Sequence, residues 1–310
     1  MSLWIIGNGR MSQEYQRVLI GLQIEFTVIC RKKDKIHNSV GKYYFDGLDS
    51  ALSEIQTPAR VIVAVDIENL YEVTCKLLDI GVKNILLEKP GSLYLHELIS
   101  LKEKSKATQA LIFIGYNRRH YASVQKCLEI IKEDNGVKSV KFDFTEVSLE
   151  ISKLELSNSV KNLWIIANSS HVLDLVFFMC GLPTELYSSV SGHIDWHPSG
   201  SKFGGVGYIN SDILFSYFAD WESPGRWGIE LNTEKHKLIL QPLEELKIMD
   251  SQSFEIKEVK LNDHYDKIYK PGIYAQTQSF MSDNSTNMCT IDEQINRYKI
   301  FSKTANYNYF

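Results

Sequence analysis

The sequence predicts an α/β protein in two parts, a doubly wound parallel sheet followed by an α+β domain with an open, mostly antiparallel sheet. In the first 120 residues, short and almost unbroken apolar runs alternate with segments whose apolar residues recur at helical spacing. This pattern is typical of a parallel sheet covered on both faces. After Gly136 the runs alternate apolar and polar residues instead. That alternation is typical of strands with one exposed face.

The first part is expected to span residues 1–120. Its apolar runs predict strands at residues 3–6, 26–30, 61–65, 85–87 and 111–114. Apolar residues at helical spacing predict helices at residues 12–22, 70–80 and 93–104. Residues 121–135 are expected to form a linking helix, because the turn signal Asp134-Asn135-Gly136 follows them.

The second part is expected to span residues 136–310. Its alternating runs predict strands at residues 137–147, 186–194, 207–217, 228–232 and 237–241. Helical patterns stand out only at residues 171–180 and 291–304. Two helices cannot cover such a sheet, and an uncovered apolar face is commonly buried against a second copy of the chain. The sequence therefore predicts a homodimer or homotetramer.

Composition and net charge limit the kinds of protein and of binding partner that the sequence is compatible with. The 310 residues fit two domains better than one, and 44% hydrophobic with 23% charged residues is typical of a soluble globular protein. A net charge of −4 gives no reason to expect nucleic acid or an anionic membrane surface as partner. No segment approaches the length of a membrane span, and no signal peptide is recognised. Five scattered cysteines without C-x-x-C spacing predict reduced thiols in the cytoplasm, and neither disulfides nor a metal site.

A glycine turn, Gly7-Asn8-Gly9-Arg10-Met11-Ser12, directly follows the first strand. In a dinucleotide-binding Rossmann domain the first glycine permits a tight turn, and the second lets the backbone approach a pyrophosphate. Ser12 stands where a glycine or alanine is usual, but it is also small. The sequence predicts cofactor contacts along this turn, from Gly7 to Met11, with Asp66 a further candidate near the end of the third predicted strand.

The second strand ends in TVICRKKDK, where a carboxylate would bind the ribose hydroxyls of NAD. No carboxylate occurs before Asp34, and Arg31, Lys32 and Lys33 precede it. A guanidinium can hold a 2′-phosphate through paired, charge-assisted hydrogen bonds. NADP(H) is therefore favoured over NAD(H), with Arg31 and Lys33 as candidate ligands. The alternative is an ordinary solvated basic loop.

Residues 84–94, NILLEKPGSLY, end a buried apolar run with Glu88-Lys89-Pro90. Proline cannot donate to a strand ladder, so the strand stops here. Two interpretations stay open from the residues alone. Lys89 is either an ordinary strand-end lysine paired with Glu88, or an amine held rigidly over a functional site.

Two further motifs are GYNRRH at residues 115–120 and SSHVLDLV at residues 169–176. Together with the glycine turn and Glu88-Lys89-Pro90, they resemble the Gfo/Idh/MocA family, the glucose-fructose oxidoreductase and inositol dehydrogenase group. The likeness runs over nearly the whole chain. It implies a Rossmann domain joined to a substrate and oligomerisation domain.

The resemblance also implies roles for individual residues. Lys89 would sit beside the nicotinamide and reach the hydroxyl being oxidised, with Glu88 among the cofactor-binding residues and Pro90 commonly cis. A partly desolvated ammonium can lose its proton or steady a developing alkoxide. His171 is the second catalytic candidate. Family members usually carry an aspartate where this chain has Ala167.

Candidate substrate-binding residues follow from the same two motifs. Tyr116, Asn117 and Arg118 end the last strand of the first part, and Asn168 is the polar side chain next to Ala167. Asp174, one helical turn after His171, is expected to orient that histidine or to pair with a basic group. The glycine- and aromatic-rich loop at residues 195–207 could cover a cleft, or it is an ordinary surface loop or a subunit contact.

The leading hypothesis is an NAD(P)-dependent oxidoreductase that acts on a sugar, a sugar derivative or a nucleotide sugar. Hydride would pass between nicotinamide and a carbinol carbon, while Lys89 and His171 handle the hydroxyl proton. One alternative is a dinucleotide-binding protein with little or no catalysis, a sensor or assembly partner, which Ala167 favours. The other is a reductase of an imine or a tetrapyrrole-like substrate, for which the aspartate is not needed.

Overall fold

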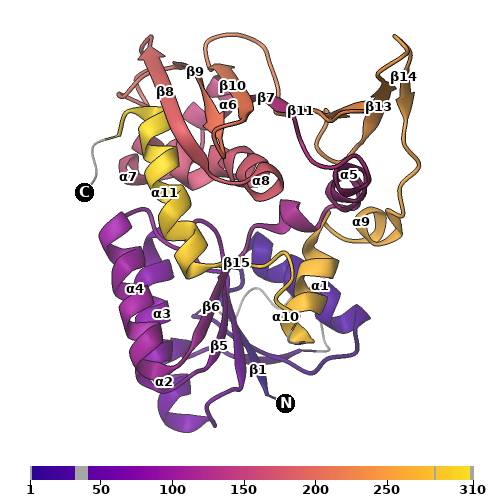
Figure 1. The fold of residues 1–310 in the computed structure, drawn as a ribbon. Coiled ribbons are helices and arrows are strands. Elements are labelled where there is room, and N and C mark those ends of the chain that lie inside the picture. Colours follow the sequence, from indigo (N-terminus) through magenta and orange to yellow (C-terminus); the bar gives the residue numbers. More distant parts are fainter. Residues whose placement is uncertain (1, 32–40, 283, 308–310) are drawn as a thin grey trace. The chain divides into compact units, whose positions relative to one another are not determined.

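The computed structural model describes residues 2–31, 41–282 and 284–307. The chain divides into two compact units (Figure 1). The first comprises Met1–Asn117 and Tyr265–Ile295, and the second comprises Arg118–His264 and Asn296–Tyr309. The sequence-based division assigned everything after residue 136 to the second part, so it was wrong for Tyr265–Ile295. This segment returns to the first unit through contacts between residues far apart in the sequence.

The first unit contains a seven-stranded sheet that is parallel except for its last strand. Its order is β15-β6-β5-β4-β1-β2-β3, and β15 pairs antiparallel with β6. The strands are β1 (Leu3–Ile6), β2 (Thr27–Ile29), β3 (Lys42–Tyr44), β4 (Arg60–Val63), β5 (Asn84–Leu87), β6 (Leu111–Ile114) and β15 (Cys289–Thr290). Every residue of β1 and β4 is buried, as the apolar runs predicted. The doubly wound parallel sheet is confirmed.

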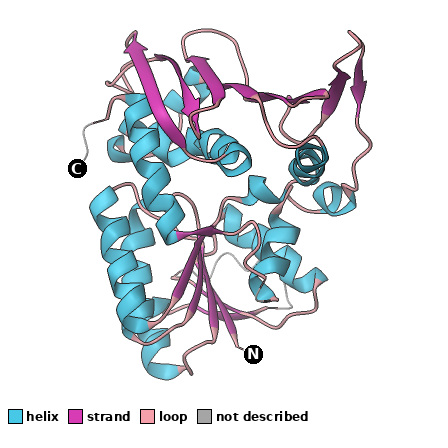
Figure 2. Cartoon of the chain, viewed as in Figure 1, coloured by secondary structure: helices cyan, strands magenta, loops and turns pink. Residues whose placement is uncertain are grey.

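Helices cover both faces of this sheet, as Figures 1 and 2 show. On one side lie α2 (Gly47–Glu54), α3 (Leu70–Asp79) and α4 (Leu95–Thr108), and on the other lie α1 (Arg10–Gly21) and α10 (Ile273–Met281). The short α9 (His264–Ile268) precedes α10. Ile273 and Phe280 of α10 join the core that Tyr15, Val18 and Leu19 of α1 form against the sheet. The returning segment therefore completes one face of the first unit.

The second unit contains an eight-stranded sheet in the order β14-β13-β12-β11-β7-β10-β9-β8. All neighbours pair antiparallel except β7 with β10. The strands are β7 (Ser139–Asp143), β8 (Pro183–Ser191), β9 (Lys202–Ile209), β10 (Ile213–Asp220), β11 (Gly228–Asn232), β12 (His236–Leu240), β13 (Lys247–Asp250) and β14 (Ile256–Glu258). The open, mostly antiparallel sheet is confirmed.

One predicted strand, residues 207–217, was wrong, because it spans the turn between β9 and β10. Asn210 and Ser211 have φ values of 51° and 63°, and the Asp212 amide donates to the Ile209 carbonyl. Positive φ at both central residues is the geometry of a tight hairpin turn that suits the twist of antiparallel strands. The usual glycine is missing, so the turn was not recognised.

Helix α8 (Ser170–Cys180) packs on the inner face of the second sheet and is buried along nearly its whole length. The Phe177 ring lies edge-on to Phe142 of β7 and Phe215 of β10, with centroids 6.3 and 5.9 Å apart. A π-helix, Ile165–Ser169, leads directly into α8. The other helices are α5 (Ala122–Glu133), α6 (Ser148–Ser152), α7 (Asn158–Asn162) and α11 (Ile291–Ala305), which begins in the first unit and ends in the second.

The outer face of the second sheet carries large apolar side chains that are 40–65% exposed. Strand pairing sets Tyr187 opposite Val206, and Tyr208 opposite Leu214. Phe218 lies on the same side of β10 as Leu214, because side chains two apart in a strand share a face. Among the described residues, no helix has both the length and the apolar character that a bilayer crossing needs.

Candidate functional site

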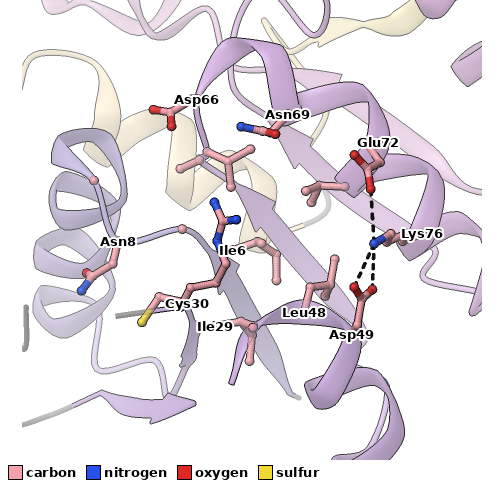
Figure 3. A pocket seen from close by; sticks show the side chains of 17 residues that line it. Ile6, Asn8, Ile29, Cys30, Leu48, Asp49, Asp66, Asn69, Glu72 and Lys76 are labelled. Atoms are coloured by element: carbon pink, nitrogen blue, oxygen red, sulfur yellow. Dashed lines mark hydrogen bonds and ion pairs between the residues drawn. The ribbon is translucent and has the colours of Figure 1, made fainter. Parts of the chain in front are cut away.

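A pocket of about 490 Å³ lies where β1, β2 and β4 end in the first unit. We call it the strand-end pocket. The chain leaves β1 for β2 on one side, and β4 lies on the other side, so the strand order reverses here. Open α/β sheets bind ligands at this kind of point. Its lining residues are Ile6, Gly7, Asn8, Gly9, Ile29, Cys30, Arg31, Gly47, Leu48, Asp49, Ala64, Val65, Asp66, Asn69, Glu72, Val73 and Lys76 (Figure 3).

The glycine turn supplies bare backbone to this pocket. Gly7 has φ of +103°, and a Cβ there would lie 2.3 Å from the Ala64 carbonyl oxygen, so only glycine fits. At Gly9 a Cβ would meet nothing within 4 Å, which leaves the backbone open beside the pocket. The buried Ser12 hydroxyl donates to the Gly7 carbonyl at 2.7 Å. This bond gives a partner to the Ser12 hydroxyl, the group by which Ser12 differs from the alanine that is usual at this position.

Helix α1 begins directly after Gly9, which has no side chain to cap the first turn. Uncapped amides at a helix N-terminus favour an anion, and with open backbone at Gly9 this suits a pyrophosphate. Asn8 is held by the Gln16 side-chain amide, which donates to its Oδ1 at 3.2 Å. The residues present therefore fit a dinucleotide.

The predicted cofactor residues divide into two groups. Gly7, Asn8, Gly9, Arg31 and Asp66 line the strand-end pocket, and Figure 3 shows Asn8 and Asp66 at its wall. Arg10 and Met11 form the first turn of α1 without lining it. Glu88 does not line it either, and Lys33 lies outside the described residues.

Sequence reasoning missed an ion-pair group in the strand-end pocket. Lys76 Nζ lies 2.8 Å from Asp49 Oδ1 and 3.3 Å from Glu72 Oε1 (Figure 3). The hydrogen bond to Asp49 raises the pKa of Lys76, with a further contribution from Glu72. Both carboxylates therefore face a cation already, while the residue that directly follows Cys30 at the end of β2 is Arg31.

Glu88 lies buried just after β5, where the Tyr15 hydroxyl donates to its Oε1 at 2.6 Å. Burial raises the pKa of Glu88, although the Tyr15 hydrogen bond and the charges of Lys89 and Lys270 oppose this. The Lys89–Pro90 peptide is cis, as the resemblance implied. The turn is held at both ends, because the Gly91 amide donates to the Glu88 carbonyl and Gln294 Nε2 donates to the Pro90 carbonyl. Lys89 is thus half-buried on an anchored turn.

His171 lies in the first turn of α8 and is buried. Its ring centroid is 6.2 Å from that of Trp227. Trp227 lines a pocket of about 260 Å³, which we call the second-unit pocket. The lining residues are Arg118, Thr145, Glu146, Val147, Gly225, Arg226, Trp227, Pro242, Leu243 and Glu244. Ala167, in the π-helix, is also buried.

Asp174 pairs with basic groups, one of the two roles expected of it. Arg119 donates from Nε and an Nη to the two carboxylate oxygens at 2.8 and 2.6 Å. Arg297 Nε lies 3.3 Å from Oδ1. All three side chains are buried and line neither pocket. Removing one member of such a group would leave an uncompensated buried charge, so replacing Asp174 alone would destabilise the unit.

The remaining substrate candidates separate in the structure. Tyr116 is buried in the first unit, and Asn117 Nδ2 donates to the Pro271 carbonyl at 2.8 Å, so both belong to its packing. Arg118 lines the second-unit pocket with its guanidinium carbon 4.9 Å from the Trp227 ring centroid. Asn168 contacts another residue of that pocket, because its Nδ2 donates to Glu146 Oε1 at 3.1 Å.

The loop at residues 195–207 is packed around a buried histidine. His197 Nδ1 lies 2.6 Å from the Gly200 carbonyl, and Nε2 lies 2.6 Å from the Tyr307 hydroxyl. A carbonyl only accepts, so Nδ1 carries the proton and Nε2 accepts from Tyr307. Burial lowers the pKa of His197 to about 4. Trp196 stacks on Trp221 with centroids 5.4 Å apart, which fixes the loop further.

Comparison with known proteins identifies the fold. No protein-family model matches the sequence, and no curated protein matches it. Among solved structures, UDP-N-acetylglucosamine 3-dehydrogenase from Acidithiobacillus ferrooxidans aligns at 14% identity over 99% of this chain and 97% of its own, with a TM-score of 0.74. The WlbA dehydrogenase from Bordetella pertussis, in complex with NADH and UDP-GlcNAcA, aligns at 13% identity over 99% and 95%, also with 0.74.

A third structure, an oxidoreductase from Desulfitobacterium hafniense described as NADPH-dependent, aligns at 15% identity over 99% of this chain and 95% of its own, with a TM-score of 0.79. The chain has the fold of the Gfo/Idh/MocA-type dehydrogenases. The resemblance inferred from the glycine turn and from Glu88-Lys89-Pro90 is confirmed at the level of fold.

Within this fold, sequence reasoning missed Glu146 and Trp227. Glu146 is buried, and its Oε1 accepts from Ser169 Oγ at 2.6 Å as well as from Asn168. One signal pointed to it. Val140, Phe142 and Phe144 alternate inward, and the next position of that period is Glu146. A carboxyl group at a position where the alternation predicts a buried apolar residue indicates a polar environment inside the unit.

Proposed function

We propose that this chain is a nicotinamide-dependent oxidoreductase that transfers hydride between the cofactor and a carbinol carbon of a sugar, sugar derivative or nucleotide sugar. The strand-end pocket carries the proposal, because its open backbone at Gly9 and the uncapped start of α1 suit a pyrophosphate. The similar WlbA structure, in complex with NADH and UDP-GlcNAcA, supports this class of cofactor and substrate. None of the five cysteines forms a disulfide within the described residues, which suits a reducing compartment such as the cytoplasm.

Lys89 is the proposed proton-transfer residue, and His171 is the second proposed catalytic residue. When bound, a nicotinamide supplies the hydride acceptor or donor. A lysine on an anchored turn keeps a defined position, and a positioned amine can take up or release the proton of a substrate hydroxyl. The buried Glu88 carboxyl group and the bond from Gln294 to Pro90 hold the backbone on either side of Lys89.

Cofactor titration with a panel of sugars tests the proposal. We expect NADH or NADPH fluorescence to change on binding, and one sugar or nucleotide sugar to support cofactor turnover. Cofactor binding without turnover on any member would favour the dinucleotide-binding protein without catalysis, which Ala167 makes a specific alternative. Absence of cofactor binding would contradict both functions.

We further propose that NADP(H) is preferred over NAD(H). Arg31 lines the strand-end pocket, and the carboxylates of Asp49 and Glu72 in the same pocket pair with Lys76. An unpaired carboxylate at the end of β2 would repel a 2′-phosphate, whereas a guanidinium can bind it through two hydrogen bonds.

A homo-oligomer is proposed to form through the outer face of the second sheet. Tyr187, Val206, Tyr208, Leu214 and Phe218 expose apolar surface there. Contiguous apolar surface of this kind marks an interaction site, and a self-complementary patch produces a two-fold dimer. Light scattering at micromolar concentration should return a dimer or tetramer, and Phe218→Asp should shift it toward monomer. A wild-type monomer would contradict the proposal.

A further inference from the structure

The second-unit pocket contains a buried carboxyl group in a fixed position. Glu146 follows β7 and points into the unit, where Asn168 Nδ2 and Ser169 Oγ both donate to Oε1. Asn168 and Ser169 belong to the π-helix that precedes α8. Burying a carboxyl group is costly unless hydrogen bonds compensate, so the two donors explain how this side chain is tolerated at the pocket wall.

Arg118 brings a cationic group to the same pocket. Its guanidinium lies over the Trp227 ring at 4.9 Å and near the Tyr121 ring at 6.0 Å. Arg118 Nε is buried and makes no hydrogen bond within the described residues. Buried donors in proteins nearly always have a partner. Because Arg118 lines the pocket, its guanidinium is placed to bind an acceptor group of a ligand there. Trp227 also contacts the His171 ring, which connects the pocket to the start of α8.

We propose that the second-unit pocket binds a hydroxylated ring that carries an anionic group, with Glu146 accepting hydrogen bonds from the ring hydroxyls and Arg118 binding the anion. The inference rests on the proposed function, since this ligand would be part of its sugar substrate. A volume of about 260 Å³ suits a single ring, because sites for drug-sized ligands begin at roughly 300 Å³. Either a phosphate or a carboxylate would serve as the anion for Arg118.

Calorimetry without cofactor tests the pocket directly. The probes are UDP-N-acetylglucosamine, which carries phosphate, glucuronate, which carries carboxylate, and the neutral sugars glucose and N-acetylglucosamine. The wild type should bind at least one anionic probe more tightly than the matching neutral sugar, and the better anionic probe identifies the anion. No binding of any of the four probes would overturn the proposal.

Two variants separate the roles. Glu146→Gln should weaken every bound probe by about tenfold to a hundredfold, the range for hydrogen bonds to charged groups. Arg118→Met should weaken only the anionic probe and remove its advantage over the neutral sugar. The matched control is Glu150→Gln, an exposed glutamate on α6, which should bind like the wild type. Equal affinity of Glu146→Gln and Glu150→Gln would overturn the role of Glu146.

A milder variant guards against misfolding at the buried position. Ser169→Ala removes one donor to Glu146 and should weaken the probes less than Glu146→Gln does, by about threefold to tenfold. Ser152→Ala, on an exposed helix, is its control. Unchanged affinity in a folded Ser169→Ala together with a misfolded Glu146→Gln would also count against the proposal. Nicotinamide fluorescence is measured separately, so loss of cofactor binding in the wild type would reject the oxidoreductase without touching the sugar result.

Discussion

The strand-end pocket and the second-unit pocket differ in the parts of the chain that line them. The first is lined by the ends of three neighbouring strands, by the glycine turn and by residues of α2 and α3, and all its lining residues lie between Ile6 and Lys76. The second is lined by four short segments that lie between Arg118 and Glu244, with the charged side chains of Arg118 and Glu146 among them. Backbone amides bind phosphate whatever the rest of the ligand is, whereas converging side chains discriminate between ligands. The strand-end pocket thus suits any ligand that carries a phosphate at the glycine turn, whereas the second-unit pocket should select a particular ligand.

Lys89 lines neither pocket, so replacing it should lower the reaction rate without weakening ligand binding in either pocket. Lys89→Met keeps the apolar stem and removes the amine, and the rate on the true substrate should fall by about 10²–10⁴. Affinity for nicotinamide cofactor and thermal stability should stay at wild-type values. Lys106→Met, on the exposed side of α4, is the control. A full rate in Lys89→Met would remove the basis for catalysis and leave a binding protein.

The fold around the strand-end pocket should not tolerate an added Cβ at the first glycine of the turn. Gly7→Ala places a methyl group 2.3 Å from the Ala64 carbonyl oxygen at a positive φ, and we expect the free energy of unfolding to fall by about 3 kcal/mol. Gly9→Ala has φ of −79° and an open environment, so its stability should change by less than about 0.5 kcal/mol.

Urea unfolding and cofactor titration together measure these two variants. Gly9→Ala should lose cofactor affinity while it keeps its stability, because its methyl group occupies the space beside the phosphate site. Equal cofactor affinity in Gly9→Ala and wild type would show that the dinucleotide does not approach this turn.

The same contrast explains what the sequence could predict. The glycine turn was found because its chemistry lies in consecutive residues, and the strands of the first sheet were found because buried parallel strands are apolar throughout. Glu146 has no motif, and its two donors come from a segment more than twenty residues later. Short or exposed strands such as β3 and β14 gave no periodic signal. The return of Tyr265–Ile295 depends on long-range packing, which local patterns do not encode.

The stability of the second unit should be sensitive to acid, because a buried histidine, His197, lies in its packing. Burial holds the pKa of His197 at about 4, below its ordinary value of 6.5. The neutral form is therefore favoured in the folded state, so its contribution to stability is complete above pH 6.5. That contribution is lost as pH falls toward 4 and amounts to about 3 kcal/mol.

Urea unfolding at a series of pH values measures this loss. His197→Asn should be less stable than the wild type at pH 7, and the difference should shrink by pH 4. The exposed His193→Asn should keep the wild-type dependence. A His197→Asn profile parallel to that of the wild type would mean that this imidazole does not control the acid sensitivity.

Arg31 is the side chain by which the strand-end pocket should discriminate between NADPH and NADH. It follows β2 and lines the strand-end pocket, so a 2′-phosphate bound there could accept charge-assisted hydrogen bonds from its guanidinium. Arg31→Ala should weaken NADPH by about 1.5–3 kcal/mol and leave NADH almost unchanged. Fluorescence titration with both cofactors measures the difference, and Arg17→Ala, an exposed arginine on α1, is the control. Equal affinity of the wild type for NADH and NADPH would reject the preference. A preference for NADPH that survives Arg31→Ala would assign the 2′-phosphate to another residue of the strand-end pocket.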